Sequence, residues 1–249
     1  LRVYGVDLLG NVWRFDVNDT LAPAGREATL LATVKDPSGN PQPITVAPRL
    51  AEVGSPPSPF VYVSTGKYLG TTDVTTTQVQ SIYAIKDPLG TTPYVDLRAS
   101  LKKLTMTAVG TDRFVSCDTA SPTSNCGSTD GWVVDLIEPG ERVNVAMELQ
   151  LGTLVVASNV PGNTACAPGG FSFLNFFDFA TGFSPAGTTA PSGYQLAGLT
   201  VGISIVRLPD GTVVVYRQKH TGEPPEKEDV PIASGAPTGK RLTWREIMP

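Results

Sequence analysis

Short runs of apolar and β-branched residues recur along the whole chain and predict strands from end to end. In the first two, Arg2–Val6 and Asn11–Val17, apolar and polar positions alternate with a period of two. Val, Ile, Thr, Tyr and Phe pack well on a pleated surface, so these runs favour strands over helices. The other predicted strands are Ile44–Ala47, Phe60–Ser64, Ser81–Ile85, Trp132–Leu136, Arg142–Met147, Thr153–Ala157, Phe171–Phe177 and Thr212–Tyr216.

Turn residues separate these runs and indicate antiparallel hairpins. Asp7–Gly10, Asp36–Gly39 and Asp87–Gly90 share an Asp-x-x-Gly pattern. Asp commonly opens a type I turn, and Gly tolerates the backbone conformation near its end. Pro209-Asp210-Gly211 predicts a further tight hairpin.

A few segments depart from the strand-and-turn pattern. The apolar spacing within Pro93–Leu104 predicts the one helix, and Thr71–Thr77 is typical of a loop. Residues 184–193 read as a mobile connection and residues 222–239 as a flexible surface segment. No composition shift divides the chain, so we expect residues 1–249 to form one unit.

Composition narrows the classes of protein that fit. Gly 25 and Pro 22 disfavour a helical bundle, since both residues break helices. The balance of Lys+Arg 19 against Asp+Glu 23 gives a net charge of -4 and no basic footprint for nucleic acid. No apolar run reaches the roughly 18 residues that a membrane-spanning helix needs. The chain opens at Leu1 directly into a predicted strand, so we expect it to be part of a longer protein.

Cysteines and acidic residues cluster in one polar loop. Cys117 and Cys126 flank Asp118–Asn125, and we predict that they form a disulfide in an oxidising compartment. The alternative is three unrelated small apolar residues, Cys166 being the third. Asp118, Asn125 and Asp130 are candidate binding residues of this loop; they could take part in a cation site or simply cap turns.

The strand-turn units recur loosely, which favours an all-β fold of the β-propeller class. Blades of four strands repeat at roughly 40–50 residues, so this length supplies about four or five of them. We therefore expect several blades of a larger propeller that form an incomplete ring. A β-sandwich with long loops is the alternative fold.

Six motifs follow one another in a recognisable order along nearly the whole chain. The first and most distinctive is Gly10-Asn11-Val12-Trp13-Arg14-Phe15-Asp16. The others are Gln42–Thr45 with Pro48, Ser64–Leu69 with Asp73 and Gln80–Asp87, Gly131–Leu136 with Gly140–Val143, Cys166–Gly170, and Trp244–Glu246. In this order they resemble the C-terminal β-propeller of the PilC/PilY family, which comprises type IV pilus biogenesis factors and pilus-tip adhesins.

The resemblance implies a noncatalytic domain that supports pilus assembly, control of retraction and surface attachment. Its implied partners are minor pilins at the pilus tip and a host or abiotic surface. Its implied location is the secreted fraction, the cell surface, the pilus tip or the outer membrane of a bacterium. Loops on a rigid scaffold usually carry such contacts, so the Cys117–Cys126 loop and residues 184–193 are the binding candidates.

The resemblance also implies calcium in the full-length parent, but no cofactor or metal in this segment. Family members carry their Asp/Asn-rich calcium loop just upstream of the segment that begins here at Val3. The resemblance therefore places that loop upstream of Leu1, and no residue of this chain is assigned to calcium.

A quinoprotein-like enzyme propeller (PQQ type) is the alternative function. Such an enzyme requires a cofactor pocket and metal-binding carboxylates, and the sequence shows no cluster of residues suited to them. The noncatalytic binding domain is therefore the favoured hypothesis.

Overall fold

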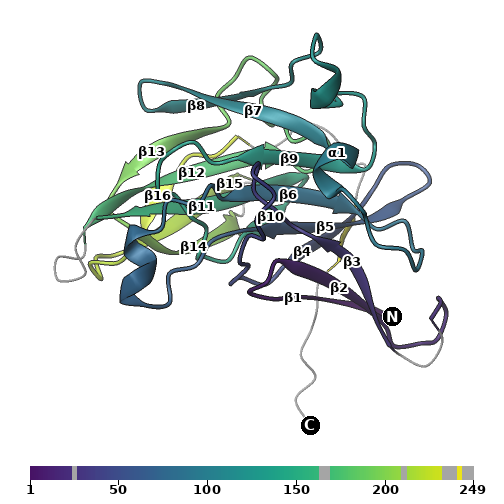
Figure 1. Ribbon diagram of the computed structural model, residues 1–249. Coiled ribbons are helices and arrows are strands. Elements are labelled where there is room, and N and C mark those ends of the chain that lie inside the picture. The colour runs from purple at the N-terminus through teal and green to yellow at the C-terminus, as the bar shows by residue number, and fades with distance from the viewer. Residues whose placement is uncertain (24–26, 163–168, 209–211, 232–239, 243–249) are drawn as a thin grey trace.

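Strands dominate the computed structural model (Figure 1), which describes residues 1–23, 27–162, 169–208, 212–231 and 240–242. Within these ranges there are 17 strands, one α-helix of 4 residues and two 3-10 helices. None of these helices is long and apolar enough to cross a membrane.

Most strands belong to four antiparallel meanders that follow one another along the chain. The first meander comprises β1 (Arg2–Val6), β2 (Asn11–Asp16) and β3 (Ala28–Thr33). The second comprises β4 (Arg49–Val53), β5 (Ser58–Ser64), β6 (Ser81–Lys86) and β9 (Gly131–Asp135). The third comprises β10 (Glu148–Gln150), β11 (Thr153–Pro161), β12 (Gly170–Asp178) and β13 (Gly193–Ala197), and the fourth β14 (Thr200–Arg207), β15 (Val213–Lys219) and β16 (Glu226–Glu228).

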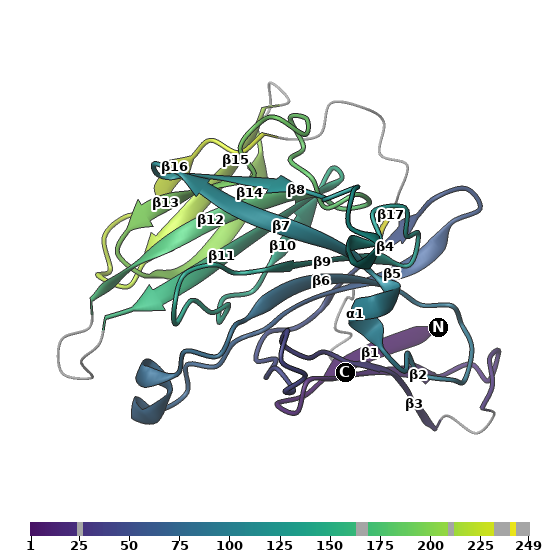
Figure 2. The same cartoon turned by 45° about the horizontal axis from the view of Figure 1, so that its top comes forward.

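One hairpin joins the second and third meanders into a continuous sheet. Its strand β7 (Lys102–Val109) runs parallel to β9, and β8 (Asp112–Ser116) pairs with β13. With β17 (Lys240–Leu242) paired to β4, this sheet has 11 strands. Both views place the first and fourth meanders at opposite ends of it (Figures 1 and 2).

Apolar side chains fill the space between consecutive meanders. The buried rings of Trp132 on β9 and Phe177 on β12 pack with their centroids 5.4 Å apart, between the second and third meanders. The core between the first and second meanders includes Val12, Leu31, Tyr83 and Val133, and that between the third and fourth includes Val155, Phe176, Ile203 and Val215. The meanders therefore stack face to face. The structure shows a mainly-β fold, while the propeller stays a prediction because separate blades are not seen.

The central strands explain why the strongest predictions from sequence were correct. β5, β6 and β9 lie between two cores and are buried on nearly every residue, as uninterrupted apolar runs predict. The confirmed strand positions are Arg2–Val6, Asn11–Val17, Phe60–Ser64, Ser81–Ile85, Trp132–Leu136, Thr153–Ala157, Phe171–Phe177 and Thr212–Tyr216, each apart from one or two end residues.

Two strand predictions were wrong, and the helix and loop predictions were right only in part. Ile44–Ala47 forms no strand, and Arg142–Met147 holds only an isolated bridge at Arg142. The helix predicted at Pro93–Leu104 shortens to α1 (Leu97–Ser100), because β7 begins at Lys102. The loop predicted at Thr71–Thr77 contains the 3-10 helix η1 (Thr71–Thr75).

Two further predicted segments are only partly described. The hairpin predicted at 209–211 lies outside the described residues. Within 222–239 the structure places β16 and describes nothing of 232–239.

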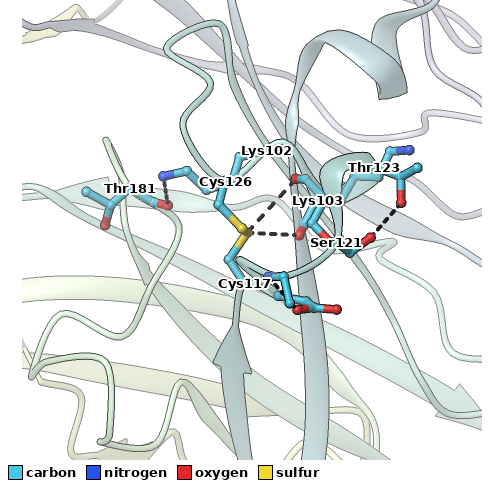
Figure 3. The surroundings of a disulfide bond; sticks show 10 residues. Lys102, Lys103, Cys117, Ser121, Thr123, Cys126 and Thr181 are labelled. Carbon is cyan, nitrogen blue, oxygen red and sulfur yellow. Dashed lines mark hydrogen bonds between the residues drawn. A yellow bond between two sulfur atoms is a disulfide. The ribbon is translucent and has the colours of Figure 1, made fainter.

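The predicted disulfide is present and ties down the loop between β8 and β9 (Figure 3). The Cα atoms of Cys117 and Cys126 lie 5.9 Å apart. The Cys117 sulfur lies 3.5 Å from the carbonyl oxygen of Lys103 on β7. A second short 3-10 helix, η2 (Pro122–Ser124), lies inside this loop. The bridge therefore fixes both ends of the loop against the β7–β8 hairpin.

Replacing both Cys117 and Cys126 by Ser should lower the free energy of unfolding by about 2–3 kcal/mol, because the bridge limits the unfolded chain. Urea unfolding of the double variant checks this. The chain has three cysteines. In the denatured, unreduced parent we expect one thiol to be labelled, that of Cys166, and after reduction we expect all three to be labelled. A Cys166→Ser variant serves as the control and should show no labelled thiol before reduction. Full labelling without reductant would contradict the bridge.

Two of the predicted Asp-x-x-Gly turns form, since Gly10 and Gly39 donate their N–H groups to the carbonyls of Asp7 and Asp36 at 3.2 and 2.9 Å. No such bond closes Asp87–Gly90, which lies between β6 and α1 rather than in a hairpin. The carboxylates of Asp7, Asp36 and Asp87 each accept the backbone N–H two residues ahead, at 2.8–2.9 Å. Partial burial raises the pKa of the Asp36 carboxyl, but hydrogen bonds from Gln78, Asn40 and Ser38 outweigh it and leave the pKa below its ordinary value. The pKa of Asp7 is lowered in the same way.

These lowered pKa values predict a loss of stability in acid. A carboxylate whose pKa falls on folding stabilises the fold above its ordinary pKa of about 4 and loses that contribution as the pH drops toward the folded value. The Asp36→Asn variant should therefore lose less stability than the parent between about pH 5 and about pH 2. Urea unfolding across this range measures the difference, and parallel curves for the two proteins would contradict it.

Candidate functional site

The predicted binding residues of the disulfide loop lie close in sequence but serve different local contacts. Asp118 accepts the backbone N–H of Ala120 at 3.0 Å. Asn125, in a left-handed backbone conformation, donates its side-chain amide to the carbonyls of Ala99 and Ser100 at 3.1 and 3.0 Å. The backbone N–H of Asp130 is bonded to Ser128. Asn125 and Ser128 thus dock the loop on the end of α1.

Part of this loop is exposed, and a role of these residues in binding a cation stays a prediction. Among the described residues there is no group of three or more His, Cys, Asp or Glu side chains that could hold a metal ion. Calcium needs six to eight oxygens gathered at about 2.3–2.6 Å, and Asp118 Oδ1 accepts the backbone N–H of Ala120. Residues 118–120, 122 and 123 are exposed. The loop can therefore offer side chains to a partner while its base stays fixed.

The first residues of the chain do not test the calcium prediction. Leu1 is exposed beside β1, and its carbonyl accepts the N–H of Val17 at 3.0 Å. The family resemblance places the calcium loop upstream of Leu1, so no described residue tests it. Calcium binding by the parent protein stays a prediction.

The other predicted contact segment, 184–193, is also tied to the scaffold. Ser184 donates its hydroxyl to the Pro191 carbonyl at 2.6 Å, which closes the segment on itself. The Ser192 N–H bonds to the carbonyl of Arg113 on β8 at 2.6 Å. Whether either segment contacts a partner stays a prediction.

Four of the motif segments that are far apart in sequence meet at one point. We name this meeting point the junction; it comprises 42–45, 64–67, 80–81 and 140–143. Thr65 lies at its centre, because its carbonyl accepts the N–H of Val143 at 3.0 Å and its hydroxyl accepts the N–H of Ser81 at 2.8 Å. Gly66 donates its N–H to the Pro43 carbonyl at 2.8 Å. The junction thus joins the second meander to the segment that precedes the third.

Gly66 is required by this close approach. Its φ of 144° lies in a region that L side chains rarely adopt. A Cβ at this position would lie 2.6 Å from the backbone nitrogen of Val143 and 2.7 Å from the Cβ of Arg142. Any side chain here would push the 140–143 segment away.

The Arg142 side chain holds the segment that follows Gly66 by hydrogen bonds to the backbone carbonyls of that segment. Its buried guanidinium donates to the carbonyls of Lys67 at 3.1 Å and Thr76 at 2.9 Å, and also to that of Asp73. Burial lowers the pKa of this guanidinium, whereas Asp73 and Tyr68 act in the opposite direction. Arginine starts from a pKa above about 12, so the group stays charged. We name residues 67–76, which include η1, the clamped segment.

Asp73 fixes the same segment from inside. Its carboxylate accepts the N–H groups of Leu69 and Gly70 at 2.8 and 3.1 Å and lies 3.1 Å from the Lys67 ammonium. The hydrogen bond from Leu69 is the strongest influence on its pKa, which lies below the ordinary value. The clamped segment is therefore organised by one internal carboxylate and one external guanidinium.

Glu141, the neighbour of Arg142, faces the opposite way into the core. Its carboxylate forms a two-pronged ion pair with Arg113 of β8, at 2.6 and 2.8 Å, and neither side chain is exposed. Ser158 of β11 donates to the same carboxylate. Arg113 also donates to Asn175 of β12 at 3.2 Å. This pair thus binds the segment before β10 to three strands.

A cavity of about 280 Å³ opens beside the junction. Its lining combines amides, a hydroxyl and charged groups with two apolar residues, without histidine or cysteine; it comprises Leu8, Pro43, Lys67, Thr76, Gln78, Gln80, Glu141 and Arg142. Several of these residues belong to the sequence motifs, but no local pattern in the sequence indicates that they share one cavity. The glycine of the Ser64–Gly66 run was the available signal, because a glycine can permit the close approach of two backbones.

Comparison with known proteins identifies relatives of this chain. No family model matches it. A type IV pilus biogenesis factor PilY1 homolog of Xylella fastidiosa is 30% identical over 266 residues, covering 99% of this chain. The type IV pilus biogenesis factor PilY1 of Pseudomonas aeruginosa is 26% identical over 236 residues, covering 78% of this chain. The chain spans only 21% and 20% of the lengths of these two relatives.

A solved structure supports the same relationship at the level of the fold. The crystal structure of the Pseudomonas aeruginosa PilY1 C-terminal domain superposes with a TM-score of 0.68 at 20% identity, covering 91% of this chain and 57% of that chain. The resemblance found in the motifs is thereby confirmed. The chain belongs to the PilY1 family of type IV pilus biogenesis factors and corresponds to part of their C-terminal domain.

Proposed function

We propose that this chain is a noncatalytic binding domain of a type IV pilus biogenesis factor. In the parent protein it would support pilus assembly, control of retraction and attachment to a surface, with minor pilins and a host or abiotic surface as partners. Its place would be outside the cytoplasm, at the pilus tip, the cell surface or the outer membrane.

The observation that carries this proposal is a disulfide-fixed, exposed loop on a rigid β scaffold related to PilY1. Disulfides persist in oxidising compartments, which agrees with a protein outside the cytoplasm. Contacts are usually made by loops that a scaffold positions, and here the loop between β8 and β9 is both exposed and docked at its base.

The proposal includes a propeller for the parent domain. Four meanders in chain order, stacked face to face over three apolar cores, are what consecutive blades require. Calcium binding by the full-length parent also belongs to the proposal, with no residue of this chain assigned to it.

The binding role of the disulfide loop can be tested with the double variant Thr119→Arg and Thr123→Arg of the full-length parent, expressed in its own bacterium. Both residues are exposed in the disulfide loop, so the fold should tolerate the change. We expect cells that still display pili, as seen by electron microscopy, but whose attachment to a surface falls severalfold because two long charged side chains obstruct the contact.

The matched control is Thr107→Arg, on an exposed position of the neighbouring strand β7. It should leave attachment unchanged. Normal attachment of the Thr119/Thr123 variant would reject the loop as a contact surface. Normal pili and twitching in a strain lacking the whole gene would reject the pilus function itself.

A further inference from the structure

Asn18 lies in an exposed turn that directly follows β2. Its backbone N–H donates to the carboxylate of Asp16 at 3.0 Å, while its side-chain amide forms no hydrogen bond with another described residue. The next two residues, Asp19 and Thr20, are exposed as well. The fold therefore does not use the Asn18 side chain, which stays open to modification from the solvent.

The sequence around Asn18 matches an acceptor sequence for N-linked glycans. Such an acceptor is an asparagine followed by any residue except proline and then by serine or threonine, as in Asn18-Asp19-Thr20. Bacterial oligosaccharyltransferases also select an acidic residue two positions before the asparagine, which is Asp16 here. No other asparagine of the chain meets even the shorter pattern. The full bacterial pattern therefore occurs once, and it falls on an exposed turn.

The acidic and hydroxyl side chains of this acceptor sequence also close the turn. The Asp16 carboxylate accepts the hydroxyl of Thr20 at 2.8 Å, and Asp16 is only 5% exposed. A transferase that reads both side chains must therefore act before the turn closes. Once the chain has folded, the Asn18 side chain is still exposed, so it can carry a glycan without any change in packing.

We propose that Asn18 is the acceptor of an N-linked glycan, which is transferred outside the cytoplasm from a lipid-pyrophosphate-linked oligosaccharide. The amide nitrogen of Asn18 forms a bond to C1 of the first sugar. The bond between C1 and the pyrophosphate oxygen breaks, and the lipid pyrophosphate leaves with the electron pair. The amide proton passes to a carboxylate of the transferase. This inference rests on the extracytoplasmic location in the proposed function, but on no contact made by the disulfide loop.

The test exports the full-length parent to the periplasm of a bacterial host that carries an oligosaccharyltransferase and its undecaprenyl-pyrophosphate-linked oligosaccharide. Mass spectrometry of the peptide that contains Asn18 measures the fraction of chains with one added glycan. We expect the parent to gain the glycan mass and Asn18→Gln to gain none. Thr20→Val should lose the glycan and Thr20→Ser should keep it, because transfer needs a hydroxyl at this position.

Asp16→Ala separates recognition by the transferase from stability of the turn. If Asp16 acted only by closing the turn, its loss would expose the sequence and raise the modified fraction. As part of the acceptor sequence, its loss should abolish the modification. Asp16→Glu keeps a carboxylate at this position and should keep the glycan. These opposite expectations hold whether or not Asp16→Ala weakens the fold, since transfer precedes closure of the turn.

Asn40→Gln is the matched control, since Asn40 is also exposed in a turn but is followed by Pro41. It should leave the modified fraction unchanged. An unmodified Asn18 in the parent, while a known acceptor protein is glycosylated in the same cells, would overturn the proposal. An undiminished glycan in Asp16→Ala or Thr20→Val would overturn it as well. Neither result bears on pilus assembly or attachment, so the proposed function would stand.

Discussion

The structure depends on two adjacent residues, Glu141 and Arg142, whose side chains point in opposite directions and bind different parts of the molecule. Glu141 forms the buried ion pair with Arg113 that ties the second meander's exit to β8, β11 and β12. Arg142 holds the clamped segment through three of its carbonyls. A buried ion pair need not add net stability, but leaving one partner unpaired costs about 3–5 kcal/mol. The Glu141–Arg113 pair thus determines how these strands are arranged, whether or not it adds to the free energy of unfolding.

This constraint connects the fold to its binding surfaces. Because the 140–143 segment is fixed from the core side, Val143 and Arg142 can hold Thr65 and the clamped segment on the other. The disulfide loop is held in place by its covalent bond, and its base is docked on the end of α1. A binding role suits a chain whose exposed surfaces are held from beneath in this way.

The mainly-β fold, eight of the 17 described strands, the disulfide and the family could be predicted from the sequence, because these leave local signals: apolar periodicity, turn residues, cysteine spacing and ordered motifs. What depends on distant partners could not be predicted in this way. Arg14 looked like the polar half of an alternating strand, yet it is 1% exposed and paired with Asp87, 73 positions away. Arg142 lay in a predicted strand, although its backbone forms only a bridge. No local pattern announces that the carbonyls of Lys67 and Thr76 will surround its guanidinium.

The most direct test of this account is native-state hydrogen exchange on Arg142→Met, with Arg49→Met as a control for loss of a half-exposed arginine. The account predicts that amides of the clamped segment, such as those of Leu69, Gly70 and Thr76, exchange much faster in Arg142→Met. The amides of β6 should keep their protection, since β6 is held by its own sheet. Unchanged exchange in the clamped segment, or equal acceleration throughout the chain, would contradict the claim that Arg142 fixes this segment locally.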